Sequence, residues 1–96
     1  MASRNSRYSQ PVRPGEDVLF QELDGEAVLL DMTSEQYFGL NEVGTRIWQL
    51  IDTHHDLNAV FQAMSEEYAV EPEQLRRDLD GFVEELSTAG LLQFGE

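Results

Sequence analysis

The dipeptide Asp24-Gly25 separates two strand-like runs, Val18 to Leu23 and Ala27 to Met32. Asp-Gly between such runs is among the strongest short-range signals for a β-hairpin, because a type I′ turn requires a positive φ at both central positions. The second run is apolar on both faces, which is typical of a strand with a neighbour on either side. The sequence therefore predicts a hairpin whose second strand is the centre of a small antiparallel sheet.

A third, short strand is predicted from Gln36 to Leu40, after a polar segment (residues 31 to 35) with the composition of a turn. Tyr37 and Gly39 share one face of this strand, and Gln36, Phe38 and Leu40 share the other. Because no fourth strand is predicted beside it, its outer backbone groups form an open edge that invites an added peptide strand. The alternative is a short edge that the acidic surface merely protects.

Three helices are predicted after the strands. Asn41 and Asp56 are placed to cap the first two, Pro72 suits the first turn of the third, and Gly90 ends it. Each helix has an apolar stripe at helical spacing. The stripes are Val43, Ile47, Leu50 and Ile51; Leu57, Val60, Phe61, Met64 and Tyr68; and Leu75, Leu79, Phe82, Val83 and Leu86. The predicted fold class is α+β, with three strands followed by three helices.

The chain of 96 residues is long enough for one domain with one modest core. Residues 1 to 15 combine Ser, Asn, Arg, Pro and Gly without periodicity, so they are predicted to form a flexible arm. The domain itself is predicted over residues 16 to 96, closing with the extended piece or packed tail "LLQF".

Charge and composition exclude several classes of function. The 19 acidic residues outnumber the six basic ones, and this body should be repelled by phosphate backbones, so we expect no nucleic-acid binding. No apolar run approaches the ~20 residues that span a bilayer, and the N-terminus lacks the apolar segment of a secretory signal. We therefore expect a cytoplasmic protein that does not bind membranes.

No catalytic constellation, metal site or cofactor site is predicted. The chain has no cysteine, and its only histidines, His54 and His55, are neighbours that point in different directions. A general acid or base would need a pocket that shifts its pKa, and so small a fold has little room for one. We interpret the chain as a binding protein.

Arg76 and Arg77 are the only basic residues after position 46. They can pair locally with Glu73 or Asp80 at helical spacing, or they can form a positive spot that receives a carboxylate from a partner. The sequence leaves both interpretations open.

The segment "LLDMTSEQYFGLNEVGTRIWQLID" resembles the signature region of PqqD-like proteins, which recognise precursors of ribosomally synthesised, post-translationally modified peptides. The shared features are Asp31 at the end of a strand, the aromatic pair Tyr37-Phe38, Leu40-Asn41, Gly44, and an apolar helix with Ile47-Trp48. The segment "EEYAVEPEQLRRDLDGFVEELSTAGLL" resembles the family's closing section, so the likeness covers about residues 16 to 93. One departure is Ser34-Glu35, where many members have Thr-Gly; it changes the turn but not the expected binding role.

The resemblance implies a winged-helix-like fold and a non-catalytic function, in which the leader segment of a precursor peptide is held for a separate leader peptidase or modifying enzyme. It also implies that the leader adds as a strand beside the third strand and lies against the third helix. Carried over by position, the strand supplies Gln36, Tyr37, Phe38, Gly39 and Leu40, and an exposed shoulder of the helix supplies Leu75, Arg76, Leu79, Asp80 and Val83. Both the lasso-peptide and the pyrroloquinoline quinone branches have such members, and the former is favoured by the Tyr-aromatic-x-Leu-Asn run.

Two other functions fit parts of the sequence. A winged-helix DNA-binding regulator would share the fold but would need a basic recognition helix. A small subunit that only stabilises an enzyme would not contact the peptide at all.

Overall fold

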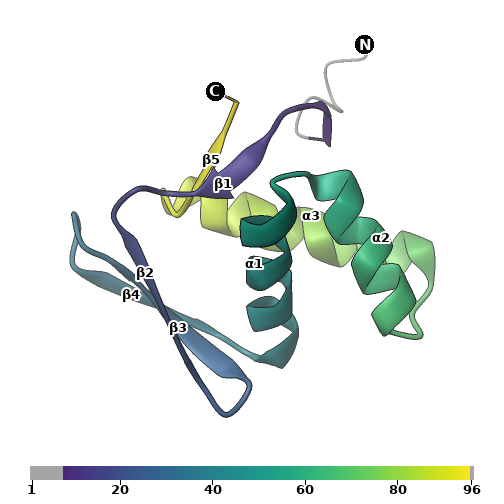
Figure 1. Cartoon of the computed structure of the whole chain (residues 1–96), viewed down its shortest axis with the longest axis horizontal. Helices are drawn as coiled ribbons and strands as arrows, with labels where there is room; N and C mark the ends of the chain where they lie inside the picture. The colour runs from purple at the N-terminus through teal and green to yellow at the C-terminus, as the bar shows by residue number, and fades with distance from the viewer. Residues whose placement is uncertain (1–7, 96) are drawn as a thin grey trace.

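The structure, a computed structural model, describes residues 8–95. Strands β1 (Val12–Pro14), β2 (Val18–Leu23), β3 (Glu26–Asp31) and β4 (Gln36–Leu40) precede helices α1 (Glu42–His54), α2 (Leu57–Glu67) and α3 (Pro72–Thr88), and strand β5 (Leu92–Phe94) closes the chain (Figure 1). The α+β class, with a three-stranded antiparallel sheet followed by three helices, is confirmed.

Strands β2, β3 and β4 form one antiparallel sheet, which we call the wing sheet. Asp24 and Gly25 both have positive φ angles, 57° and 85°, as the predicted type I′ turn between β2 and β3 requires. β3 pairs with β2 on one side and with β4 on the other, so its predicted central position is confirmed.

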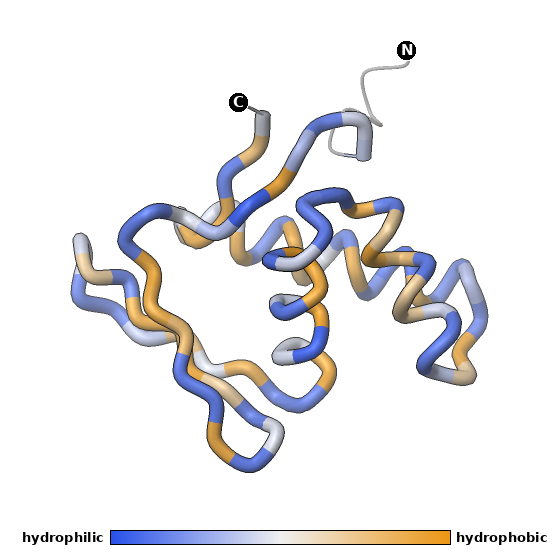
Figure 2. The backbone as a smooth tube through the Cα atoms, viewed as in Figure 1, coloured by the Kyte–Doolittle hydropathy of each residue, from blue (hydrophilic) through white to orange (hydrophobic). Residues whose placement is uncertain are grey.

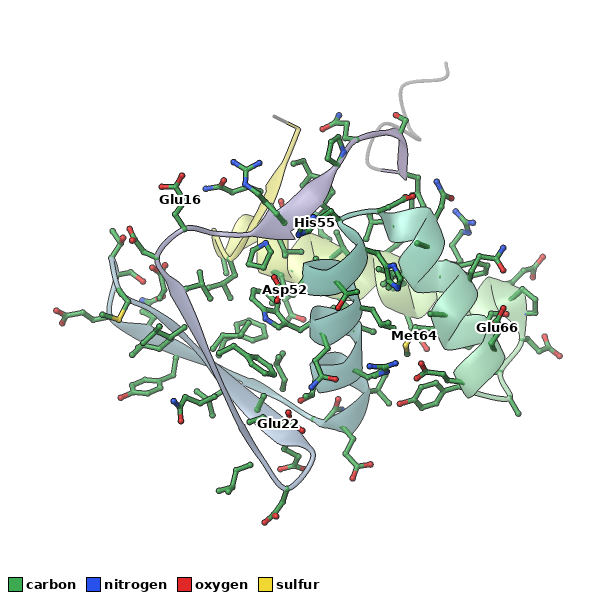
Figure 3. All side chains as sticks on the ribbon, in the orientation of Figure 1. Glu16, Glu22, Asp52, His55, Met64 and Glu66 are labelled. Atoms are coloured by element: carbon green, nitrogen blue, oxygen red, sulfur yellow. The ribbon has the colours of Figure 1, made fainter. Side chains whose placement is uncertain are left out.

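The inner face of the wing sheet packs against α1. Ala27, Leu29 and Leu40 are buried on this face, in one core with the apolar stripes of the three helices. Val43 is the exception: it was predicted in the stripe of α1, but it is 42% exposed and lies outside the core. On the same side of the sheet, Glu22 accepts a hydrogen bond of 3.0 Å from the side chain of Gln49 in α1 (Figure 3). The sheet and the helices are therefore one packed unit, joined by apolar contacts and by this polar one.

The predicted caps set where α1 and α2 begin. The backbone N–H of Gly44 donates to Asn41 Oδ1 over 2.9 Å, and that of Asn58 donates to Asp56 Oδ1 over 3.0 Å. Each bond satisfies a donor that has no partner within its own helix. Because Asn41 follows β4 directly, its cap also determines where the chain turns from the wing sheet into α1.

The flexible arm predicted for residues 1 to 15 is corrected for the described part of that segment. Val12–Pro14 forms β1, which pairs antiparallel with β5, and the Val12 side chain is 1% exposed in the core. The N–H of Gly15 donates to the carbonyl of Leu91 over 2.9 Å. Residues 1 to 7 lie outside the described range. The arm lacks helical or strand periodicity because β1 is too short to show one, and its partner is at the other end of the chain.

Candidate functional site

Strand β4 is an edge of the wing sheet, since the order of strands is β2-β3-β4 and no described strand pairs with its outer side. In a two-residue type I′ hairpin the residues flanking the turn, here Leu23 and Glu26, exchange backbone hydrogen bonds. Successive residues of β3 direct their backbone N–H and C=O groups alternately toward β2 and toward β4. With the observed register, the backbone groups of Phe38 point toward β3, and those of Tyr37 and Gly39 point toward the free edge. Two residues therefore direct their N–H and C=O groups outward, where no strand of residues 8–95 pairs with them.

Below this edge, a hollow of about 430 Å³ lies between β4 and α3. Its lining residues are Tyr37, Phe38, Gly39, Leu40, Asn41, Phe82 and Glu85; we call it the β4–α3 groove. Phe38 and Phe82 are both half-buried, and Glu85 is exposed. The groove thus offers two aromatic surfaces and one carboxylate next to an open strand edge.

Phe82 is held in place by the start of α1. A Cβ atom added at Gly44 would lie 3.1 Å from Phe82 Cε1, closer than ordinary packing distances. Gly44 therefore lets the ring lie against the first turn of α1, beside the Asn41 cap that ends β4. The strand edge, the cap and the ring are positioned by one local arrangement.

Five of the predicted site residues, Gln36 to Leu40, lie on β4, and all except Gln36 line the groove. Three of the residues predicted on α3 lie in the core and not in the groove. Leu75, Leu79 and Val83 are 5%, 0% and 0% exposed, respectively, so the prediction that they lie on an exposed shoulder is wrong. Their spacing of four residues keeps them on the face of α3 that fills the core.

Arg76 and Asp80 lie on a different side of α3 from the groove. The Tyr8 hydroxyl donates to Asp80 Oδ1 over 2.8 Å, and Arg76 Cζ lies 4.6 Å from the centre of the Tyr8 ring and 4.8 Å from that of Phe61. Burial raises the pKa of the Tyr8 hydroxyl, and its bond to Asp80 raises it further. Both residues therefore anchor the start of the described chain on the helices. Asp80 is about 200° around the helix from Phe82.

The α3 residues that do line the groove, Phe82 and Glu85, were absent from the predicted site. The sequence places Phe82 in the apolar stripe of the third helix, and no sequence motif singles out Glu85. They are three residues apart and so lie on one side of the helix. A half-exposed aromatic residue at the border of an apolar stripe, with a polar residue one turn later, was the signal that could have identified this side.

Within residues 8–95 no group of three or more His, Cys, Asp or Glu side chains could hold a metal ion. Over the same part of the chain, none of the helices is long and apolar enough to cross a membrane.

Comparison with known proteins gives a family and two structures. Residues 26–92 match the family described as "Coenzyme PQQ synthesis protein D (PqqD)". The structure "TbiB1 in Complex with the TbiA(beta) Leader Peptide" has 33% sequence identity and a TM-score of 0.81, covering 84% of this chain and 94% of that one. The structure "Lasso peptide synthetase B1 complexed with the leader peptide" has 29% identity and a TM-score of 0.78, covering 86% and 98%. No curated protein matches the chain.

Proposed function

Because the chain belongs to the PqqD family, we propose that it recognises the leader segment of a ribosomally synthesised precursor peptide by adding the leader as a strand to β4. The observation that carries this proposal is the open edge at Tyr37 and Gly39, which adjoins the β4–α3 groove. In such strand addition the main-chain hydrogen bonds supply affinity, and alternate side chains of the peptide supply specificity. Both solved relatives are described as complexes with leader peptides.

The geometry of the groove supports the following binding site. Alternate leader side chains point below the sheet, where Phe38 and Phe82 offer apolar surface and Glu85 offers a charge at the rim. We therefore keep Gln36 to Leu40 in the proposed site. On α3, Phe82 and Glu85 replace the five residues first predicted there, because those residues face the core or the start of the described chain.

The protein acts, in this proposal, as a non-catalytic partner of a separate leader peptidase or modifying enzyme. One relative is described as a lasso peptide synthetase component, which favours a precursor of the lasso-peptide type. Precursors of this class are made on ribosomes, so a protein that binds them before processing is expected in the cytoplasm.

The proposal is tested by titrating the leader of the cognate precursor against two substitutions at one position. Gly39→Pro removes an outward N–H donor, and an edge strand tolerates proline because no ladder bond to β3 is lost. Gly39→Ala is the matched control, since an added Cβ meets nothing within 4 Å. We expect leader affinity to fall at least about tenfold for the proline variant and to change less than about twofold for alanine.

Melting curves accompany both titrations, because loss of folding would also lower binding. Phe38→Pro is unsuitable as a test, since its backbone groups are directed toward β3 and the substitution is expected to unfold the wing sheet. If Gly39→Pro is folded and binds the leader as well as the wild type, strand addition at β4 is wrong.

A further inference from the structure

The outer face of the wing sheet carries several exposed apolar side chains, and no element of residues 8–95 packs on it. The helices pack on the opposite side of this sheet (Figure 1). Along β2 the first half is hydrophobic and a hydrophilic stretch precedes the last residue, Leu23 (Figure 2). Leu19, Leu23, Val28 and Tyr37 are 49%, 77%, 39% and 75% exposed, respectively. With the partly buried Leu30 they form what we call the outer-face patch.

The outer-face patch is contiguous across all three strands. Leu19 pairs with Leu30, and Leu30 pairs with Tyr37, so three apolar side chains form one row. In the next row Val28 lies between the polar Gln21 and Gly39, whose missing side chain leaves the surface open. A shallow hollow of about 460 Å³ over this second row is lined in part by Leu23, Val28 and Gly39.

Leader binding in the β4–α3 groove leaves this patch unexplained. A strand added to β4 uses the edge and the groove below it, while β2 and the outer side of β3 stay exposed. Monomeric proteins rarely expose contiguous apolar patches larger than a few hundred Å², and such larger patches commonly mark protein–protein contacts. A central strand that is apolar on both faces thus indicates a second partner.

Charge selects the kind of partner. Asp24 and Glu26 lie at one end of the outer face, and Glu35 lies in the turn at the other. A second copy of this chain, with a net charge of −13, would bring like charges to the same contact. The complementary surface is an apolar one flanked by lysine or arginine side chains.

We propose that the outer-face patch is the docking surface for the separate enzyme that processes the leader-bound precursor, and that the enzyme presents such a basic-flanked apolar surface. This inference rests on the proposed function. Tyr37 and Gly39 belong to both surfaces, since their side-chain positions face outward from the sheet while their backbone groups face the leader edge. A leader strand on β4 extends the same face, so an enzyme docked there lies beside the bound peptide.

The test uses the processing enzyme encoded with the precursor and a pair of matched valines. Val28 is 39% exposed in the patch, and Val70 is 37% exposed in the α2–α3 connection. We expect Val28→Ser to weaken enzyme binding at least about tenfold and Val70→Ser to change it less than about twofold. Leu19→Ser, on the edge strand β2, is a second patch variant in case the central strand tolerates serine poorly. Leader affinity and melting temperature are measured for each.

The outcomes separate this inference from the proposed function. The docking surface would be overturned if both patch variants are folded and still bind the enzyme like the wild type. Equal losses of enzyme binding from Val28→Ser and Val70→Ser would overturn it as well, and so would a wild-type protein that does not bind the enzyme. A dimer in sedimentation that Val28→Ser dissociates would overturn it too, by assigning the patch to a second copy. Failure of the wild type to bind the leader, with enzyme binding still sensitive to Val28→Ser, would refute the proposed function while keeping the docking surface.

Discussion

Leu79 and Phe82 are three residues apart on α3, yet they meet different surroundings. Leu79 is 0% exposed and is enclosed by the core, whereas Phe82 is half-buried between the β4–α3 groove and Gly44. At the scale of single residues, this small rotation around the helix separates a residue that stabilises the fold from one that is available to a peptide.

The first prediction follows from this difference. Leu79→Ala should lower the free energy of unfolding by ~2–5 kcal/mol, because it leaves a cavity in the core. Phe82→Ala should cost less stability but should weaken leader binding at least about tenfold, because aromatic residues at the centre of a contact carry much of its energy. Denaturant unfolding and leader titration measure the two effects.

Arg77→Ala is the control for these variants, since Arg77 is exposed on α3 and lies about 140° around the helix from Phe82. It should leave both stability and leader affinity near the wild type. Unchanged leader affinity in a folded Phe82→Ala protein would remove α3 from the proposed site.

At the scale of secondary-structure elements, the pairing of β1 with β5 joins the two ends of the described chain. Val12 contributes a buried side chain, and Arg13 donates to the carbonyl of Gly95 over 3.1 Å. Tyr8 adds contacts to both α2 and α3, since Asn58 Nδ2 donates to its carbonyl over 3.0 Å and Asp80 accepts from its hydroxyl. The described segment before the wing sheet, from Tyr8 onward, is therefore part of the folded domain.

The second prediction concerns removal of this segment. A chain that starts at Gly15 loses β1 and the buried Val12, and burial of a valine side chain is worth about 1.5–3 kcal/mol. We expect a clearly lower melting temperature than for a chain that starts at Tyr8. At temperatures where both are folded, leader affinity should agree within a few-fold, because β1 lines neither β4 nor the groove.

Circular dichroism melts and leader titrations of the two truncated chains provide the comparison. Equal melting temperatures would show that β1 adds nothing to stability. A hundredfold loss of leader affinity in the folded shorter chain would instead make the segment part of the binding site.

At the scale of the whole molecule, the formal charge of −13 favours leader recognition over DNA binding, two functions that share this kind of fold. DNA recognition by a helix is favoured by a positive face, because lysine and arginine side chains neutralise the phosphates and release their counterions. Helix α3 and its N-cap carry Arg76 and Arg77 against Glu71, Glu73, Asp78, Asp80, Glu84 and Glu85. Nothing in the comparisons favours a DNA-binding regulator.

The third prediction is that the protein does not shift duplex DNA in a gel at low salt, where electrostatic binding is strongest. The same preparation should bind the leader peptide, which shows that it is active. A DNA complex that dissociates as the salt concentration rises would contradict this prediction. It would mean that attraction to the phosphates is stronger than repulsion by the acidic surface.

Local interactions explain what could be predicted from the sequence alone. The Asp24-Gly25 turn, the Asn41 and Asp56 caps and the three apolar stripes each depend on residues within a few positions of one another. The structure has all of them except the first member of the α1 stripe, since Val43 is 42% exposed. The central position of β3 followed from its two apolar faces. Resemblance of the short strand and its surroundings to one family then pointed to leader binding at β4.

Only the tertiary structure shows which element each helix face and each strand edge packs against. Helical periodicity assigns Leu75, Leu79 and Val83 to one face, but only packing shows that this face fills the core and that Phe82 and Glu85 turn toward β4. β1 was missed because its hydrogen-bond partners are in β5, at the far end of the chain, and a three-residue strand has no pattern of its own. Periodicity determines which side chains share a face, whereas the partner of that face depends on contacts between residues distant in the sequence.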